Sequence, residues 1–440
     1  MCALLSFYTL HAQDTLHVMT YNVLYYGDSP TCQGNHSAYH TYLKTIVAST
    51  KPDILGMEKM AAIPVFSGDH SGTAPIGFAD SVLQFALNAA FPSTYAYCTF
   101  TNSAGADNIS VLFYNKNKLG FHSITSTYTN ITDFNTYKLY YKDTSITTTH
   151  DTLFLYVTLN HTQSGTGSSN EAIRETQISG EMMQIATHFS RLPNMLNMGD
   201  FNTHHSIEAC YQQLVAPSDT NYLFYDPPFY PDAHASYPAD WDSYPSEYSN
   251  FLTTSTRLSS SIPNSCGTNG GAKSWYDHIF ISPSILKNTN HIYYIPNSYR
   301  TIGNDGDRMG ISINDVPTNS SESSSVIEAL FQMSNKYPVM IDLLVNSTKV
   351  SVKKQNEEAG NFRISNPVFD EKLQINIPQE YMYKEIKLEC YDFLGRIQMQ
   401  RNFISNKTKI ILPFNMLKGN YILKLICDGN IVTNTIITII

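Results

Sequence analysis

Carboxylate, amide and imidazole side chains stand at or just after the ends of apolar runs at five points along the chain. In chain order they are Asn22, Glu58, His161, Asp200 together with Asn202, and Asp277. Carboxylates and amides bind hard divalent cations, and such cations activate water and neutralise negative charge on phosphoryl oxygens. The set therefore contains the groups that hydrolysis of a phosphate ester requires.

The sharpest of these points is Gly199-Asp200-Phe201-Asn202, which follows the apolar run 194–197. Its carboxylate and its amide are two residues apart on one side of a tight turn. Taken singly, the other points have ordinary interpretations: Asn22 as a turn residue, Glu58 as a solvated or capping group, His161 as a loop hydrogen-bonding residue. Their combination and order point to catalysis.

The order of helical and strand-like patterns predicts the fold that positions these five groups of residues. Helical spacing of apolar residues covers 39–49, 80–90 and 171–189, and strand-like runs cover 16–24, 53–57, 94–99, 109–114, 152–159 and 194–197. A long segment rich in Pro, Tyr and Asp, 203–273, predicts either loops that shape a substrate site or a mobile insertion. Interleaved helices and strands predict an α/β fold with polar groups at a sheet edge.

Composition shifts divide the chain into four predicted parts. Residues 1–13, with the apolar run 3–10, are predicted to be the end of a signal peptide, and 14–345 form the α/β domain. The polar stretch 346–361 is predicted to be a linker, and 362–440 alternates apolar and polar residues as a small all-β domain. No run in the chain reaches about 18 apolar residues, so no membrane span is predicted.

Charge is distributed unevenly between these parts. From Ser347 onward there are 13 basic and 9 acidic residues, a net charge of about +4, whereas the first 346 residues hold 15 basic and 28 acidic residues, about −13. An acidic catalytic region argues against tight, sequence-independent binding of polyanions. The seven cysteines show no CxxC or CxxH spacing, which argues against a zinc site and leaves disulfide pairing open.

The ordered set resembles the endonuclease/exonuclease/phosphatase superfamily, which includes deoxyribonuclease I-like nucleases and sphingomyelinase-like phosphodiesterases. The resemblance covers about 16–345 and includes Arg174-Glu175-Thr176-Gln177 and the segment 307–314 (DRMGISIN). It implies a four-layer α/β sandwich, deoxyribonuclease I-like. It also implies that Mg²⁺ or Mn²⁺ is bound by Glu58 with help from Asn22.

The same resemblance implies the remaining roles. Asp200 would orient or deprotonate the attacking water, and Asn202 would hold a phosphate oxygen or the metal. His161 would donate a hydrogen bond or a proton near the leaving group, and Asp277 would orient a second histidine.

The chain departs from the family pattern at its end. The family closes with Ser-Asp-His before a Pro-Val strand, and here the segment reads Ser334-Asn335-Lys336-Tyr337-Pro338-Val339. A lysine with an ordinary pKa stays charged at neutral pH and is a poor base, although its charge can neutralise a phosphoryl oxygen. We therefore expect a reduced rate, and a catalytically inactive binding protein is the alternative.

Three further histidines, His204, His205 and His278, lie next to the motifs. They are either replacements for the missing imidazole or extra metal ligands, or they are solvent and loop histidines. The last of these interpretations is favoured.

The C-terminal part resembles the sorting domain of type IX secretion. The matching segments are 364–368 (ISNPV) with 373–376 (LQIN), 391–396 (YDFLGR) and 417–424 (LKGNYILK). The resemblance implies an immunoglobulin-like β-sandwich that engages the type IX secretion machinery. An adhesive or carbohydrate-binding β-sandwich is the alternative.

These observations lead to one prediction of function. The chain is predicted to be a secreted or cell-surface metal-dependent phosphoester hydrolase, exported through the periplasm of a Gram-negative bacterium. A phosphodiesterase or nuclease is favoured, with extracellular nucleic acid as the preferred substrate class. The catalytic set is His161, Asp200, Asn202, Asp277 and Lys336, with Asn22 and Glu58 at the metal. A surface protein whose tail mediates adhesion is the third possibility.

Overall fold

The computed structural model describes residues 13–27, 36–62, 68–70, 77–103, 105–129, 131–143, 152–232, 239–259, 267–346, 362–365, 368, 371–392, 396–428 and 430–439. The chain divides into two compact units, 1–349 and 350–440. The boundary falls within the predicted linker, of which 347–361 lie outside the described residues. The predicted leader also lies outside them, except for Gln13, which begins the first strand.

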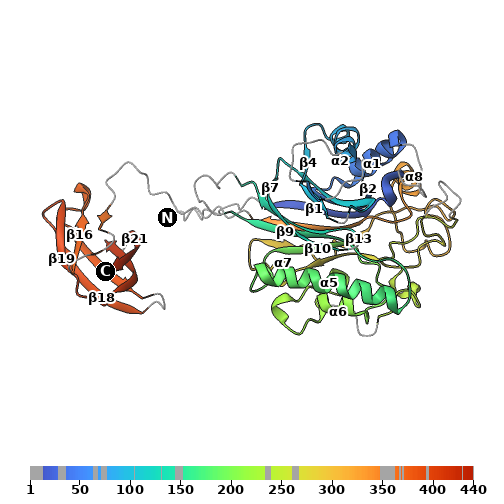
Figure 1. Ribbon diagram of the computed structural model, residues 1–440. Coiled ribbons are helices and arrows are strands. Elements are labelled where there is room, and N and C mark those ends of the chain that lie inside the picture. Colours follow the sequence, from blue (N-terminus) through green and yellow to red (C-terminus); the bar gives the residue numbers. More distant parts are fainter. Residues whose placement is uncertain are drawn as a thin grey trace, which may run out of the picture. The chain divides into compact units, whose positions relative to one another are not determined.

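Two mixed sheets form the centre of the first unit (Figure 1). In spatial order, the strands of the first sheet are β12 (Ile292–Tyr294), β14 (Val339–Asn346), β1 (Gln13–Asn22), β2 (Ile54–Ala61), β6 (Asn108–Asn115) and β4 (Tyr95–Tyr97), with β13 (Arg300–Thr301) also on β14. In the same way, the strands of the second sheet are β11 (Asp277–Ile281), β10 (Met195–Asp200), β9 (Phe154–His161), β8 (Phe134–Tyr141) and β7 (Leu119–Thr127). A short pair, β3 (Gly68–His70) and β5 (Phe100–Asn102), stands apart.

Helices cover the outer faces of both sheets (Figure 1). The first sheet carries α1 (His36–Thr50), α2 (Gly77–Val82) with the π-helical turn Leu83–Leu87 and α3 (Asn88–Ala90), and α8 (Ser324–Met333). The second carries α5 (Ser168–His188), α6 (Ala209–Val215) and α7 (Pro283–Leu286). The order helix, sheet, sheet, helix is the four-layer α/β sandwich that the sequence predicts.

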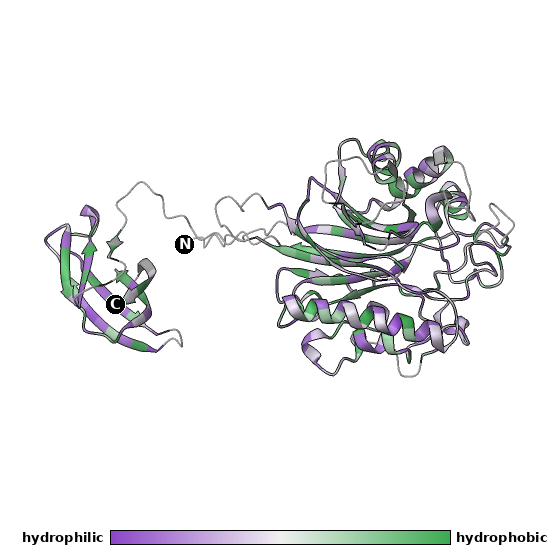
Figure 2. Ribbon diagram, viewed as in Figure 1, coloured by the Kyte–Doolittle hydropathy of each residue, from purple (hydrophilic) through white to green (hydrophobic). Residues whose placement is uncertain are grey.

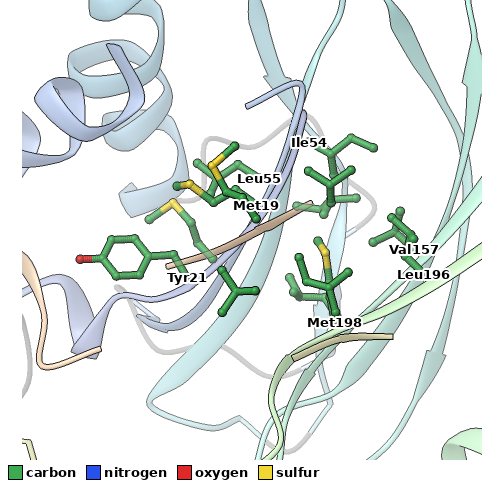
Figure 3. Packing of buried hydrophobic residues seen from close by; sticks show 14 of the residues in the cluster. Met19, Tyr21, Ile54, Leu55, Val157, Leu196 and Met198 are labelled. Carbon is green, nitrogen blue, oxygen red and sulfur yellow. The ribbon is translucent and has the colours of Figure 1, made fainter. Parts of the chain in front are cut away.

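Apolar side chains fill the space between the sheets, and hydropathy alternates along the strands (Figure 2). Met19, Tyr21 and Leu55 gather on one face of the first sheet, while Ile54 faces Met198 of the second (Figure 3). At Gly56 an added Cβ would lie 2.5 Å from Leu159 Cδ1. A glycine there lets the sheets approach closely, which brings their polar strand ends within reach of each other.

Several elements differ from the sequence prediction. The hairpin of β7 and β8 and the helix α6 were not predicted, and α6 lies inside the segment expected to be loop. Strand β2 continues past Glu58 to Ala61, although the apolar pattern ends at Met57. Hydrogen bonds to β6 on both sides of a bulge carry the strand through its polar residues.

The second unit is a sandwich of two antiparallel sheets around its own apolar core. One sheet is β15 (Arg363–Ile364), β16 (Lys372–Asn376) and β19 (Lys409–Pro413), and the other is β18 (Ile397–Ile404), β17 (Glu385–Tyr391), β20 (Gly419–Cys427) and β21 (Asn430–Ile439). This confirms the predicted small all-β domain. Within the described part of the chain, none of the helices has the length and apolar character needed to cross a bilayer.

Candidate active site

Strand pairing places the predicted residues at one edge of the first unit. The parallel pair β1–β2 aligns Asn22 with Glu58, and the parallel pair β9–β10 aligns His161 with Asp200. The carboxyl ends of parallel strands lie at the same edge of a sheet, and the antiparallel pairing of β10 with β11 adds Asp277 opposite Asp200. A hydrogen bond of 2.8 Å from Asn22 Nδ2 to Asp200 Oδ2 joins the two sheets there.

Glu58 is fully buried at the bulge in β2. Its Oε1 accepts a hydrogen bond from the Thr20 hydroxyl, while Oε2 is buried and has no hydrogen-bond partner. Burial raises the pKa of Glu58 well above its usual value, and the nearby charges of Asp277 and Asp200 raise it further. A buried oxygen without a donor is costly, so this carboxylate is arranged to receive a cation or a proton.

The bulge also brings in Lys59, which the sequence analysis missed. Glu58 and Lys59 together stand opposite Ser110, because Met57 pairs with Val111 and Met60 with Ile109. Lys59 has a φ of 53°, and its ammonium lies 5.0 Å from the centre of the Tyr25 ring. Burial lowers the pKa of Lys59, whereas the charge of Asp200 raises it. A second cationic group therefore lies beside the site.

Asp200 and Asn202 form the tight turn that the sequence indicated. Gly199 has a φ of 139°, and an added Cβ would lie 2.0 Å from the Asn160 carbonyl oxygen, so only glycine fits before the aspartate. The backbone N of Asn202 donates to Asp200 Oδ1 at 3.1 Å, and the side-chain Nδ2 of Asn202 donates to the Thr162 carbonyl. Although burial raises the pKa of Asp200, Lys336 and His161 lower it below its usual value. Asp200 is therefore held ionised.

Lys336 lies in the middle of the site. Its Nζ is 3.0 Å from Asp200 Oδ2 and 3.3 Å from Asp277 Oδ2, and it stands 4.5 Å from the centre of the Tyr276 ring. Burial alone would lower the pKa of Lys336, but the two carboxylates raise it above its usual value. The side chain is 5% exposed, so it is a fixed positive charge shielded from solvent.

Asp277 faces Lys336. Its Oδ2 also accepts a hydrogen bond of 2.6 Å from Thr253, while Oδ1 is buried without a partner. Burial raises the pKa of Asp277 to about 7, with Lys336 opposing the shift and Asp200 adding to it. Asn335 points elsewhere, since its Nδ2 donates to the Thr268 hydroxyl at 2.7 Å.

His161 is a neutral imidazole at the rim of the same edge. Burial lowers its pKa to about 4, and the nearby ammonium groups of Lys59 and Lys336 also lower it. Its Nδ1 is buried without a hydrogen-bond partner. A neutral imidazole can still donate one hydrogen bond to an oxygen of a substrate.

Two of the three neighbouring histidines, His204 and His278, have different environments. His204 Nδ1 contacts Asp242 Oδ2 and lies 3.3 Å from the Tyr276 hydroxyl, whose ring touches Lys336. His278 is fully buried, with its nitrogens 3.2 Å from Asp226 and from the Trp275 carbonyl. His278 is therefore a core residue of β11, not the solvent or loop histidine that was favoured, whereas His204 belongs to a polar cluster next to the site.

Buried polar contacts hold two loops of the candidate site in place. Arg174 on α5 pairs with Glu208 at 2.7 Å and donates to the carbonyls of Gln163 and Gly165. Glu208 also accepts from the His204 backbone N. Because α5 is a rigid helix, these bonds fix the loops after His161 and after Asp200 relative to each other.

The residues at Glu58 fit a hard divalent cation. Among the described residues, no group of three His, Cys, Asp or Glu side chains is arranged to hold a metal. Mg²⁺ does not require such a group, because it keeps several waters and takes one or two carboxylates plus substrate oxygens. The partnerless Glu58 Oε2 meets that requirement, and Asn22 pairs with Glu58 on the neighbouring strand, where its Oδ1 accepts a hydrogen bond from Leu24 N.

No protein-family model matches the chain, and no curated protein matches it. Among solved structures, an endonuclease/exonuclease/phosphatase family protein from Bacteroides thetaiotaomicron is 14% identical, over 77% of this chain and 97% of its own, with a TM-score of 0.42. TDP2 from D. rerio, complexed with a single-strand DNA product, is 11% identical over 75% and 98%, with a TM-score of 0.43. A mannosyl-6-phosphatase from B. thetaiotaomicron is 14% identical over 74% and 99%, with a TM-score of 0.41.

The structural neighbours are thus proteins of the endonuclease/exonuclease/phosphatase family. With identities of 11–14% and TM-scores below 0.5, the likeness is remote and says nothing about the chemistry of this chain. The chemistry must be inferred from the side chains described above.

Proposed function

We propose that the first unit is a phosphoester hydrolase that uses one divalent cation, Mg²⁺ or Mn²⁺, at Glu58. The observation that carries the proposal is the link between the sheets: Asn22 bonds to Asp200 beside a buried carboxylate whose Oε2 has no partner. The cation would supply Lewis acidity and a positive charge next to the phosphoryl group.

The protein side chains would then divide the remaining work. Asp200, held ionised, accepts a hydrogen bond from the attacking water and orients it. Lys336 faces the phosphoryl oxygens with a permanent charge, and Asn202 donates a hydrogen bond to one of them. His161 donates a hydrogen bond to the leaving oxygen. Groups aimed in advance at developing charge in a buried site are the main source of such rate enhancement.

The protonation states support this division. Asp200 has a lowered pKa, so it orients water better than it removes a proton. Asp277 has a pKa of about 7, which makes it the carboxylate best matched to proton transfer near neutral pH. We therefore assign proton acceptance to Asp277, relayed by way of a water molecule.

A panel of substrates tests the proposal. Hydrolysis of DNA, RNA, sphingomyelin, a generic phosphodiester and a phosphomonoester is measured with Mg²⁺, with Mn²⁺ and with a chelator. We expect cation-dependent release of product from at least one class, and we place phosphodiesters of nucleic acid first. No hydrolysis of any substrate by folded protein would overturn the proposal.

The second candidate is a binding protein that keeps the fold without turnover. The observation in its favour is the pairing of Lys336 with two carboxylates, which leaves no basic imidazole at that position. It predicts that a phosphoester binds, with a measurable Kd, and is recovered unchanged.

We propose separately that the protein is secreted or displayed at the cell surface and that the second unit is its export signal. The independent core of that unit supports a self-contained module. Deletion of 362–440 should trap the protein in the periplasm of its host, as measured by cell fractionation. Normal surface delivery after the deletion would overturn this role.

A further inference from the structure

The ammonium of Lys336 has the surroundings of a bound cation. Two carboxylate oxygens lie at 3.0 and 3.3 Å from Nζ, and the face of the Tyr276 ring lies 4.5 Å from it. Anionic oxygens and the negative face of an aromatic ring are both attractive to positive charge. The lysine stem enters from the segment before β14, where Lys336 bridges to Thr254.

Without the lysine, the two carboxylates would need another cation or a proton to offset their charge. Asp200 and Asp277 are directly opposite each other on neighbouring strands, and each is 1% exposed. Like charges placed directly opposite in a sheet repel, and buried charges without compensation are expensive. The only cationic side chain in ion-pair contact with either of them, within the described part of the chain, is Lys336.

The oxygens around this position also form a set of hard ligands. Asp277 Oδ1 is buried and has no hydrogen-bond partner, and Asp277 Oδ2 and Asp200 Oδ2 both point at the ammonium. Carboxylate oxygens are the ligands that Mg²⁺ and Mn²⁺ prefer. With the ammonium removed, the same oxygens surround a space that suits a small divalent ion and its waters.

We propose that Lys336 occupies a second cation-binding position, formed by Asp200 and Asp277, and so acts as a built-in replacement for a divalent ion. The chain then needs an external cation only at Glu58, and the charge at the second position is present at any metal concentration. The existence of the second position does not depend on hydrolysis. Its catalytic use rests on the proposed function.

The test is to count bound ions. Mn²⁺ is titrated into the full chain and into Lys336→Ala by calorimetry, with free Mn²⁺ followed by electron paramagnetic resonance. We expect Lys336→Ala to bind one Mn²⁺ more than the parent. An unchanged count in folded Lys336→Ala would overturn the proposal.

Two matched variants place the additional ion. Lys59→Ala removes the other lysine near Asp200. Because Lys59 forms no ion pair with either carboxylate, this variant should bind as many Mn²⁺ ions as the parent. Lys336→Ala combined with Asp277→Asn removes one carboxylate from the position, and the additional Mn²⁺ should be lost. Retention of the additional ion in this double variant, or its appearance in Lys59→Ala, would contradict the assigned place.

Folding is followed separately by circular dichroism and thermal unfolding. If Lys336→Ala does not fold, Lys336→Ser, which offers a hydroxyl ligand in the same space, is titrated in its place. Mn²⁺ should raise the Tm of either variant more than that of the parent. An equal rise in Tm together with an equal count of ions would overturn the proposal.

The outcome can be separated from that of the proposed function. A parent protein that hydrolyses nothing, with a variant that gains an ion, would reject the hydrolase and keep the built-in cation. A parent that hydrolyses phosphoesters, with a variant that gains no ion, would keep the hydrolase and reject the built-in cation.

Discussion

The two sides of the candidate active site balance buried negative charge in opposite ways. On the β2 side, Glu58 has one hydrogen bond from Thr20, a partnerless Oε2 and a raised pKa. On the β10–β11 side, Asp200 and Asp277 share the ammonium of Lys336. The first side is complete only with an external cation or a proton, whereas the second carries its own cation.

A fourth buried carboxylate, Glu181 on α5, provides a reference for both sides of the site. It accepts hydrogen bonds from Asn197 Nδ2 at 2.7 Å and Asn160 Nδ2 at 3.1 Å, both neutral donors. Burial raises the pKa of Glu181 to about 8, although the amides oppose the shift. At Glu181 the two amide donors do not offset the effect of burial on the pKa, whereas at Asp200 the charge of Lys336 helps to keep the pKa below its usual value.

The largest expected effect comes from Glu58→Gln. The substitution keeps the shape of the side chain but removes the charged ligand, so cation-stimulated hydrolysis should fall by about 10³-fold, since such charge stabilisation is worth several kcal/mol. Hydrolysis rates and calorimetric Mg²⁺ affinity check this. Glu175→Gln, on the exposed face of α5, is the matched control and should behave as the parent. Equal Mg²⁺ affinity in the Glu58 variant would contradict the assignment.

Restoring the family pair tests the other side of the site. Asn335→Asp with Lys336→His should raise the rate, because Asp277 already faces position 336 and can orient an imidazole there. An oriented acid–base pair is typically worth about 10²-fold or more. A folded double variant that binds Mg²⁺ but stays inactive on every substrate would favour the binding-protein alternative. Lys336→His alone should gain less.

Stability in a chelator should separate the two sides further. Lys336→Ala leaves two buried carboxylates without their cation, which should cost about 3–5 kcal/mol of unfolding free energy. Glu58→Gln removes a buried carboxylate that has no cation and should cost far less. Urea unfolding in the presence of a chelator measures both. A larger loss of unfolding free energy in the Glu58 variant than in Lys336→Ala would contradict this difference between the two sides.

An effect that depends on pH is expected from Glu181. Because its folded pKa of about 8 lies above the unfolded value, the folded state binds more protons. The unfolding free energy should therefore fall between about pH 4.5 and 8, by at most about 1.4 kcal/mol per pH unit. In Glu181→Gln this fall should be weaker across the same window. An unchanged pH profile would mean that Glu181 is ionised in the folded protein.

The smallest effect is expected from removing the second unit. Each unit has its own apolar core, so a chain without 362–440 should keep the hydrolysis rate and the thermal unfolding midpoint of the first unit. Kinetics and calorimetry on the shortened chain check this. A clear loss of rate would mean that the second unit contributes to the site.

The strand ends that carry the chemistry could be predicted from the sequence alone. The strand-like runs 16–24, 152–159 and 194–197 become buried strands, and in the structure these strands end at Asn22, His161 and Asp200. This works because burial of alternating or continuous apolar residues is a local pattern. The α/β class and the separate β domain followed from the same pattern, whereas the four-layer sandwich was implied by the family resemblance.

Other features were decided only by the tertiary structure. Lys59 enters the site through a bulge that exists only when β2 pairs with β6, and His204 meets Asp242 38 residues away. The ion pairs of Lys336 with Asp200 and Asp277 join segments more than 50 residues apart. Local sequence does not predict such contacts, because the energy of a buried charge depends on which distant groups surround it once the sheets have packed.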